Sequence, residues 1–349
     1  MKLTFLTLCL IQAMNAAGRE TGRDTPTFQS ESKVVTVDVM VRDLANRKPV
    51  GNLSRDDFRM RIDGKERQIS YFRHDGDDRR PLAMLIFLNL APEGGLQKMS
   101  DPAALASFKE ALAKLAPEDE VAVFASRDWF VGVAKEMCGL SRDRQAAAQA
   151  MQDSVRMALE TTESERKADR SVRDKSMSAA VQRAIGAVRM RPGSQLALIQ
   201  VPNSRSYYVS DGMNTLDTIE AASRQELAEQ LQAANVSFSS MNLQMQGSYA
   251  AAATVINPLG KIFGLSITGS GNYLAKQSGG VAVEVPAAGE FGAALEQVAS
   301  AYASRYSLGY QVSESEYRDG RMHRIDVKLG GRSAKDKEVL SRRSFVDGR

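Results

Sequence analysis

LAMLIFL, residues 82–88, is the stretch that decides the fold. Its apolar residues follow one another without a polar break, which is typical of a strand that is covered on both faces. Strands of this kind belong to parallel sheets with helices packed on each side. The run therefore predicts a buried strand of an α/β sheet.

The chain beyond this run alternates between strand and helix patterns. Further strands are predicted at residues 120–125, 129–134, 196–201, 236–241 and 281–285, the second as a hairpin partner of the first. Helices are predicted within residues 103–115, 177–189, 218–234, 273–280 and 291–304. Another long helix is expected to begin with Ser141 as its N-cap. This alternation predicts one α/β domain over residues 81–304.

Both flanks of this domain have strand patterns. Strands are predicted at residues 34–41, 58–62, 69–72, 306–312, 322–329 and 343–346. Asp63-Gly64 is a turn signal that would join the second and third of these into a hairpin. Neither flank can bury a good core alone. We therefore expect residues 34–73 and 305–349 to form one smaller β-sandwich-like domain in which the α/β domain is inserted.

The N-terminus has the three-part layout of a secretory signal peptide. Lys2 precedes an apolar run at residues 3–11, and a small, polar stretch ends at residue 17. The run is shorter than the ~20 apolar residues of a membrane span, and no later stretch is long and apolar enough. We expect a signal peptide at residues 1–17, a linker at residues 18–33 and a mature protein exported to the periplasm or beyond the cell. The alternative is a buried N-terminal strand or helix.

Composition argues against several classes of protein. The 349 residues are 43% hydrophobic and 25% charged, with a formal net charge of +4, which is ordinary for a soluble globular protein. No basic block is interleaved with aromatic residues, so no nucleic-acid partner is expected. Cys138 is the only cysteine after the predicted signal peptide, so an internal disulfide is not expected either.

The residues that catalysis usually needs are scarce. The only histidines are His74, in a predicted charged linker at residues 74–80, and His323, on a predicted strand. A zinc site or a catalytic triad would lack its usual members, and Cys138 has no base near it in the sequence. We therefore expect no enzymatic activity. The alternative is a hydrolase that uses carboxylates in a cleft.

Several segments together resemble a known family. They are VDVMVRD, PVGNLSRDDF and DGK (residues 37–43, 49–58 and 63–65), LAPEDEVAV (115–123), LAKQSGG (274–280) and YSLGY (306–310). In this order they resemble the von Willebrand factor A-related proteins of Acidobacteria, over nearly the whole mature chain. The resemblance implies a Rossmann-like von Willebrand factor A (VWA) domain. Such a domain normally holds a divalent cation at the carboxyl-end face of its sheet, where open α/β sheets generally bind ligands.

The motif of the family's cation site is altered in this sequence. The family uses Asp-x-Ser-x-Ser after the first strand, a Thr from a later loop and an Asp after the fourth strand, all oxygen ligands that suit a hard cation. The corresponding residues here are Asn89, Ala91 and Glu93 for the first motif, Lys175 or Ser176 for the Thr, and Pro202-Asn203 after the fourth strand. Ser210-Asp211-Gly212 matches the last motif in letters but comes later than the strand end. The resemblance therefore implies a degenerate site, with no working metal ion and at most weak Mg²⁺ or Ca²⁺ binding.

These expectations combine into an exported, non-catalytic protein-binding module, for adhesion or as a scaffold, whose protein partner the sequence does not name. Its candidate binding face consists of Asn89, Glu93, Ser176, Asn203 and Asp211, on the loops 89–95, 161–174 and 203–214 and beside them. One alternative is a metal-dependent adhesin, in which Asp211 reaches Asn89, Glu93 and Ser176 to complete a cation site. Another is a structural role in a larger envelope assembly.

Overall fold

The computed structural model describes residues 32–76, 79–90, 95–126, 135–160, 170–191, 193–203, 207–209, 221–243, 267–313 and 320–346. The predicted signal peptide and residues 18–31 of the predicted linker lie outside them. Strand β1 (Ser32–Asp43) begins inside that linker, because Ser32 and Lys33 pair with the last residues of a C-terminal strand. The linker prediction was therefore two residues too long.

The central sheet consists of β5 (Leu82–Asn89), β6 (Glu120–Ser126), β7 (Lys135–Ser141), β8 (Gln195–Asn203), β10 (Ser237–Leu243) and β12 (Ala282–Val285). Its order is β12-β10-β8-β5-β6-β7, and all neighbours are parallel except β6 and β7. Counted along the chain, this is the arrangement 3-2-1-4-5-6 of a Rossmann-like sheet. The predicted parallel α/β sheet is confirmed. The predicted hairpin strand at residues 129–134 lies outside the described residues, and β7 begins directly after it.

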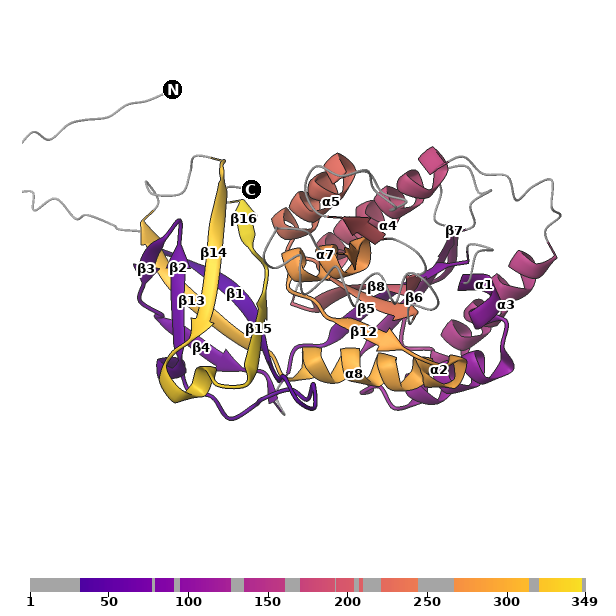
Figure 1. Ribbon diagram of the computed structural model, residues 1–349, viewed down its shortest axis with the longest axis horizontal. Helices are drawn as coiled ribbons and strands as arrows, with labels where there is room; N and C mark the ends of the chain where they lie inside the picture. The colour runs from indigo at the N-terminus through magenta and orange to yellow at the C-terminus, as the bar shows by residue number, and fades with distance from the viewer. Residues whose placement is uncertain are drawn as a thin grey trace, which may run out of the picture. The chain divides into compact units, whose positions relative to one another are not determined.

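The helices lie in two layers, one on each face of this sheet (Figure 1). One layer contains α1 (Gly95–Met99), α2 (Pro102–Ala113), α3 (Arg144–Leu159) and α8 (Phe291–Ala303), and the other contains α4 (Arg170–Met190), α5 (Ala221–Ala233) and α7 (Ser270–Ser278). In β5, Ile86 is buried toward the first layer, and Leu85 and Phe87 toward the second. Because side chains alternate along a strand, the unbroken apolar run supplies both cores at once. None of the described helices has the length and hydropathy needed to cross a bilayer.

Aspartates, not serine, begin two of these helices. The Asp143 side chain accepts a hydrogen bond from the amide of Ala146 at 2.9 Å and caps α3, and Asp101 caps α2 in the same way. The prediction of Ser141 as N-cap was wrong. Ser141 is the last residue of β7, and its hydroxyl accepts from the amide of Asp143 at 3.3 Å. Two residues are needed to turn from the strand into the helix, so the cap position falls on Asp143.

Two helical glycines differ sharply in the space around them. A Cβ added at Gly292 of α8 would lie 2.2 Å from the carbonyl oxygen of Ser107 in α2, whereas nothing lies within 4 Å of one at Gly186 in α4. We expect Gly292→Ala to lower the free energy of unfolding by about 2 kcal/mol, because backbone must move. Gly186→Ala should raise it by about 0.5–1 kcal/mol through helix propensity. Urea unfolding of both variants measures this, and a Gly292→Ala protein as stable as wild type would contradict the close packing of α2 and α8.

The N- and C-terminal segments form two further sheets and lie side by side (Figure 1). One sheet has the order β15-β1-β13-β4, with β15 (Lys337–Ser341), β13 (Tyr306–Ser313) and β4 (Tyr71–His74). The other has the order β16-β14-β2-β3, with β16 (Ser344–Val346), β14 (Met322–Leu329), β2 (Phe58–Ile62) and β3 (Lys65–Arg67). Buried side chains of both sheets form one hydrophobic cluster, which includes Val37 of β1 and Ile325 of β14. As their strand orders show, each sheet combines strands from both ends of the chain. Two short strands, β9 (Tyr207–Val209) and β11 (Ile267–Gly269), form a separate two-stranded sheet.

The predicted hairpin was wrong in its second strand. The Asp63-Gly64 turn leads directly into β3, which pairs with β2, whereas β4 pairs with β13 in the other sheet. A two-residue turn reverses the chain at once, so the residues that follow it form the partner strand. His74, predicted in a linker, is the last residue of β4, and its ring stacks on Tyr306 with 4.7 Å between the centroids.

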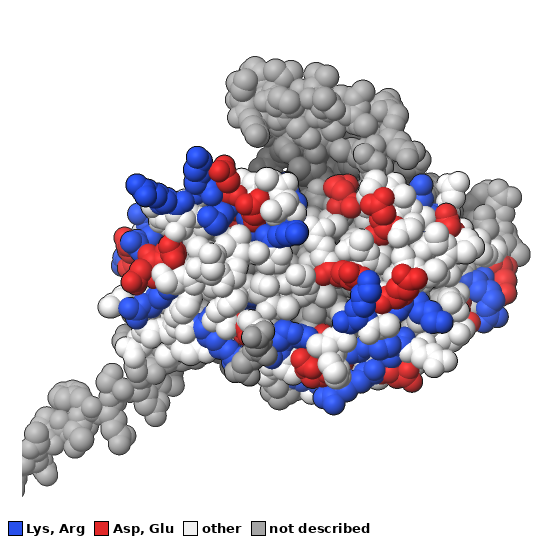
Figure 2. All heavy atoms as spheres, turned by 90° about the horizontal axis from the view of Figure 1, so that it is seen from below, with Lys and Arg blue, Asp and Glu red and all other residues white. Residues whose placement is uncertain are grey.

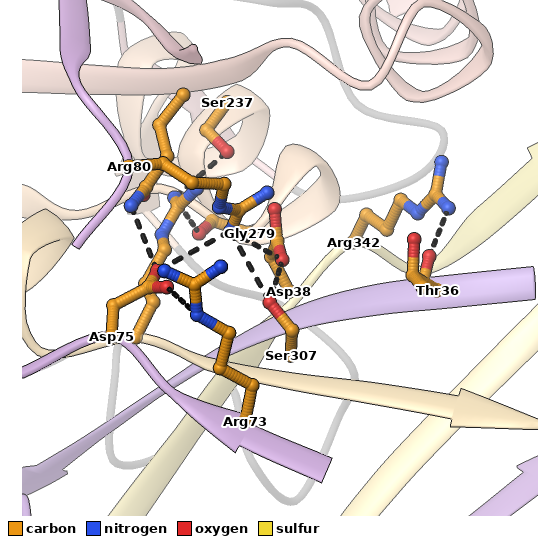
Figure 3. A network of polar contacts seen from close by, with 11 residues as sticks. Thr36, Asp38, Arg73, Asp75, Arg80, Ser237, Gly279, Ser307 and Arg342 are labelled. Carbon is orange, nitrogen blue, oxygen red and sulfur yellow. Dashed lines mark hydrogen bonds and ion pairs between the residues drawn. The ribbon is translucent and has the colours of Figure 1, made fainter. Parts of the chain in front are cut away.

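A largely buried polar network joins β1, β4 and β13 to the amino ends of the central strands (Figure 3). Arg80 lies 2.8 Å from Asp38 and 3.3 Å from Asp75, measured from its Nη2 atom to the carboxylate oxygens. Asp75 also accepts a hydrogen bond from Gln195, the first residue of β8, at 2.8 Å. Arg305 donates to Ser237, the first residue of β10, at 2.8 Å. We call these residues the junction network. It occupies the amino ends of the sheet, opposite the carboxyl ends.

Candidate functional site

The central sheet reverses its strand order between β5 and β8. Open α/β sheets bind ligands outside the carboxyl ends of their strands at such a switch point. β5 ends at Asn89 and β8 ends at Asn203, so the backbone brings these two predicted residues to the same edge of the sheet. On its other side, Asn89 pairs with Ser126 at the end of β6. The half-buried Asn89 side chain thus stands at the switch point, whereas the side chain of Asn203 is not among the described ones.

The other predicted residues of this face are only partly covered by the structure. Ser176 lies in α4, in the helix layer on one face of the sheet, and its backbone alone is described. Glu93 and Asp211 lie outside the described residues, as do most of the loops 161–174 and 203–214. That Ser176, Glu93 and Asp211 meet Asn89 stays a prediction.

Three polar residues at the same edge were missed by the sequence reasoning. Asn242 of β10 pairs in register with Asn203 of β8 on one side and with Glu284 of β12 on the other. The buried Asn242 amide donates to Asn272 Oδ1 at 2.7 Å and to Glu284 Oε1 at 3.4 Å. Asn242 directly follows one strand that the sequence predicts, and Glu284 is the last residue but one of another, so the rule of carboxyl ends would have found both. Asn272 belongs to α7 and has no such signal.

The chemistry of this edge is mostly neutral. Glu284 is exposed on β12, but partial desolvation of its carboxyl raises the pKa above its usual value, and the hydrogen bond from Asn242 offsets part of that shift. Mg²⁺ and Ca²⁺ prefer carboxylate oxygens, and an amide oxygen is a weaker ligand. Among the described residues, no three His, Cys, Asp or Glu side chains come together as a cation site would require. The described part of the edge offers the amide groups of Asn89, Asn242 and Asn272 beside the Glu284 carboxyl. Such groups suit direct hydrogen bonding to a polar surface.

His323 and Cys138, two further side chains that could take part in chemistry, have surroundings that favour a structural role. The Nδ1 atom of His323 in β14 lies 2.8 Å from Asp63 Oδ2. This contact connects the β2–β3 turn to β14, the neighbour of β2 in the sheet. Burial raises the pKa of the half-buried Cys138 thiol on β7, which disfavours the reactive thiolate. One face of the molecule shows Lys and Arg intermixed with Asp and Glu over much of its surface (Figure 2).

Comparison with solved structures finds similarities to proteins of several kinds. The chain is similar to a von Willebrand factor type A protein from Catenulispora acidiphila, at 9% identity and a TM-score of 0.41, over 92% of this chain and 76% of that one. It is similar to manganese-loaded TRAP protein from Plasmodium vivax, at 9% identity and a TM-score of 0.36, over 80% of this chain and 98% of that one. An aerotolerance-related membrane protein from Bacteroides fragilis is similar at 11% identity and a TM-score of 0.37, over 63% and 98% of the two chains.

No protein-family model matches the sequence, and no match was found among curated proteins. The structural similarities, at 9 to 11% identity, assign neither a ligand nor a partner to this chain. The fold class therefore rests on the strand order of the chain itself, which is that of a Rossmann-like α/β sheet.

Proposed function

We propose that this chain is an exported, non-catalytic protein-binding module. Its α/β part, over residues 81–304, acts as a VWA-like domain inserted in a β-sandwich-like domain made from residues 34–73 and 305–349. It recognises a protein through the carboxyl-end loops, with Asn89, Glu93, Ser176, Asn203 and Asp211 as candidate contact residues, and without a bound cation.

The observation that carries this proposal is the half-buried amide of Asn89 at the switch point of the sheet. An amide at that place would weaken a cation-dependent site, because its oxygen is a poorer ligand than a carboxylate and compensates none of the charge of a divalent ion. Hydrogen-bonding groups on a rigid sheet edge instead suit direct contacts to a partner. Among the described residues of this edge, only Glu284 has a raised pKa, and an acid/base pair for hydrolysis would need a second carboxylate beside it. This supports binding over catalysis.

Affinity capture from the native cell envelope tests the proposal. Wild type, Asn89→Arg/Asn203→Arg and the control Gln145→Arg, an exposed position on α3, serve as baits with and without EDTA. We expect the same partner on wild type and control in both buffers, and at least a tenfold loss on the Asn89→Arg/Asn203→Arg bait, because two guanidinium groups would block the face.

Two other outcomes would contradict this. A partner that falls off in EDTA would favour the metal-dependent adhesin. A partner that survives the loop substitutions but is lost on a folded Tyr310→Asp bait would favour a structural role for the two smaller sheets, since Tyr310 is buried in their shared core.

A further inference from the structure

A polar groove with a volume of about 650 Å³ lies on the described surface between α5, α7, β14 and the start of β16. None of the candidate residues of the carboxyl-end face lines it. Its volume is in the range of ligand pockets, about 300–1,000 Å³, which is enough for a few residues of a peptide. The groove is therefore a second place where this chain can hold a partner.

Hydrogen bonds connect the elements that line the groove, α5, α7 and the start of β16. The buried Gln232 of α5 donates to the carbonyl oxygen of Gln277 in α7 at 2.8 Å, and its own side-chain oxygen accepts from Ser344 of β16. The amide of Arg343 donates to the same Gln277 carbonyl at 2.9 Å. These contacts connect the two helices and the strand that line the groove.

Three basic side chains line the groove without a partner among the described residues. Lys276 of α7, Arg324 of β14 and Arg343 form no side-chain hydrogen bond or ion pair there. Lys276 and Arg324 are exposed, and Arg324 faces outward because Met322, Arg324 and Asp326 alternate with buried residues along β14. Unpaired cations around one hollow attract an anionic group.

Two acidic side chains, Glu229 and Asp326, also line the groove and restrict the kind of anion that it can bind. Asp326 is paired with Lys328 at 3.0 Å, and Glu229 accepts a hydrogen bond from Gln225 at 2.9 Å. They would repel a uniformly charged polyanion, such as a nucleic acid or a sulfated glycan. A peptide can instead place single carboxylates next to cations and neutral residues next to these acids. Met322, which is 42% exposed, adds an apolar contact at the rim.

We infer that this groove binds an acidic peptide segment of a partner protein, with Lys276, Arg324 and Arg343 contacting its carboxylates. The site is separate from the carboxyl-end face, so it holds whether or not that face binds a protein.

Selection from a random 12-residue display library tests this. The folded full chain is the target, and Lys276→Glu/Arg324→Glu/Arg343→Glu is the counter-target. Lys109→Glu/Arg332→Glu/Lys335→Glu, which reverses three exposed charges elsewhere, is the matched control. We expect peptides rich in Asp and Glu that bind wild type and control equally. They should bind at least tenfold more weakly to the groove variant, and their Glu→Gln versions should bind at least tenfold more weakly to wild type.

A second variant keeps the test decisive if the triple variant misfolds. Arg324→Gln changes a single exposed side chain and should weaken a selected peptide about threefold or more. The inference is overturned if no peptide is enriched, if the enriched peptides are neutral or basic, or if they bind the groove variants as tightly as wild type. Tighter binding of an oligogalacturonate than of any acidic peptide would overturn it as well.

Discussion

Asp75→Ala is expected to lower the free energy of unfolding by about 3–5 kcal/mol, because removal of one partner leaves other polar groups of a buried network uncompensated. The Asp75 side chain is fully buried and lies 3.3 Å from Arg80 and 3.4 Å from Arg73. It also accepts the Gln195 hydrogen bond at the start of β8. Without it, Arg80 and the Gln195 amide would stay buried with one fewer acceptor.

Urea unfolding followed by fluorescence and by circular dichroism measures this effect. Asp153→Ala is the matched control, because Asp153 forms an exposed pair with Arg156 on one helix, and we expect little change from its removal. Equal stability of the two variants would contradict a stabilising contribution of Asp75 to the junction network. We also expect the midpoints of both probes to shift together in Asp75→Ala, since Asp75 contacts residues of the central and the smaller sheets.

Asp38→Asn is expected to destabilise the protein by about 2–3 kcal/mol at neutral pH, because a largely buried ion pair loses one member. Burial alone would raise the pKa of Asp38, but Arg305 and Arg80, together with hydrogen bonds from Arg80 and Ser307, hold it below its usual 3.8. A carboxyl with a lowered pKa in the folded state stabilises that state above the unfolded value and loses this contribution as pH falls through the folded value. The difference between wild type and Asp38→Asn should therefore be constant at pH 5–7 and shrink below about pH 4.

Urea unfolding of both proteins at pH 7, 5, 4 and 3 checks this direction. A difference that grows as the pH falls would contradict the ion pairing of Asp38. The matched variant Ser307→Ala removes one hydrogen bond to Asp38 and keeps its charge, so it should cost only about 1 kcal/mol.

The central sheet was predictable because its strands have patterns that only burial explains. The run LAMLIFL has no polar face, so it must lie between two layers, and the strands and helices after it repeat the alternation. Tertiary contacts decided the elements that the sequence analysis missed or predicted wrongly. β15 has no apolar alternation and forms because it extends the sheet beside β1. β4 does not pair with β2 as predicted, because it pairs with β13 at the end of the other sheet.

The candidate site was predictable only in part. The ends of strands can be located from sequence, which places Asn89 and Asn203 at one edge and would also have placed Asn242. The contribution of a helix is harder to predict, because Asn272 reaches the edge through the packing of α7 beside β10 and not through a motif. The groove between α5, α7 and β14 could not be predicted either, since it joins segments far apart in sequence.

The claim that the switch-point face works without a cation is tested most directly by calorimetric titration of the purified chain with Mn²⁺ and Mg²⁺. The neutral amide of Asn89 predicts no saturable binding, or a dissociation constant weaker than about 1 mM. Asp211→Ala should leave this result unchanged. A micromolar dissociation constant in the wild type that is lost in Asp211→Ala would contradict the account and establish an intact metal-dependent site.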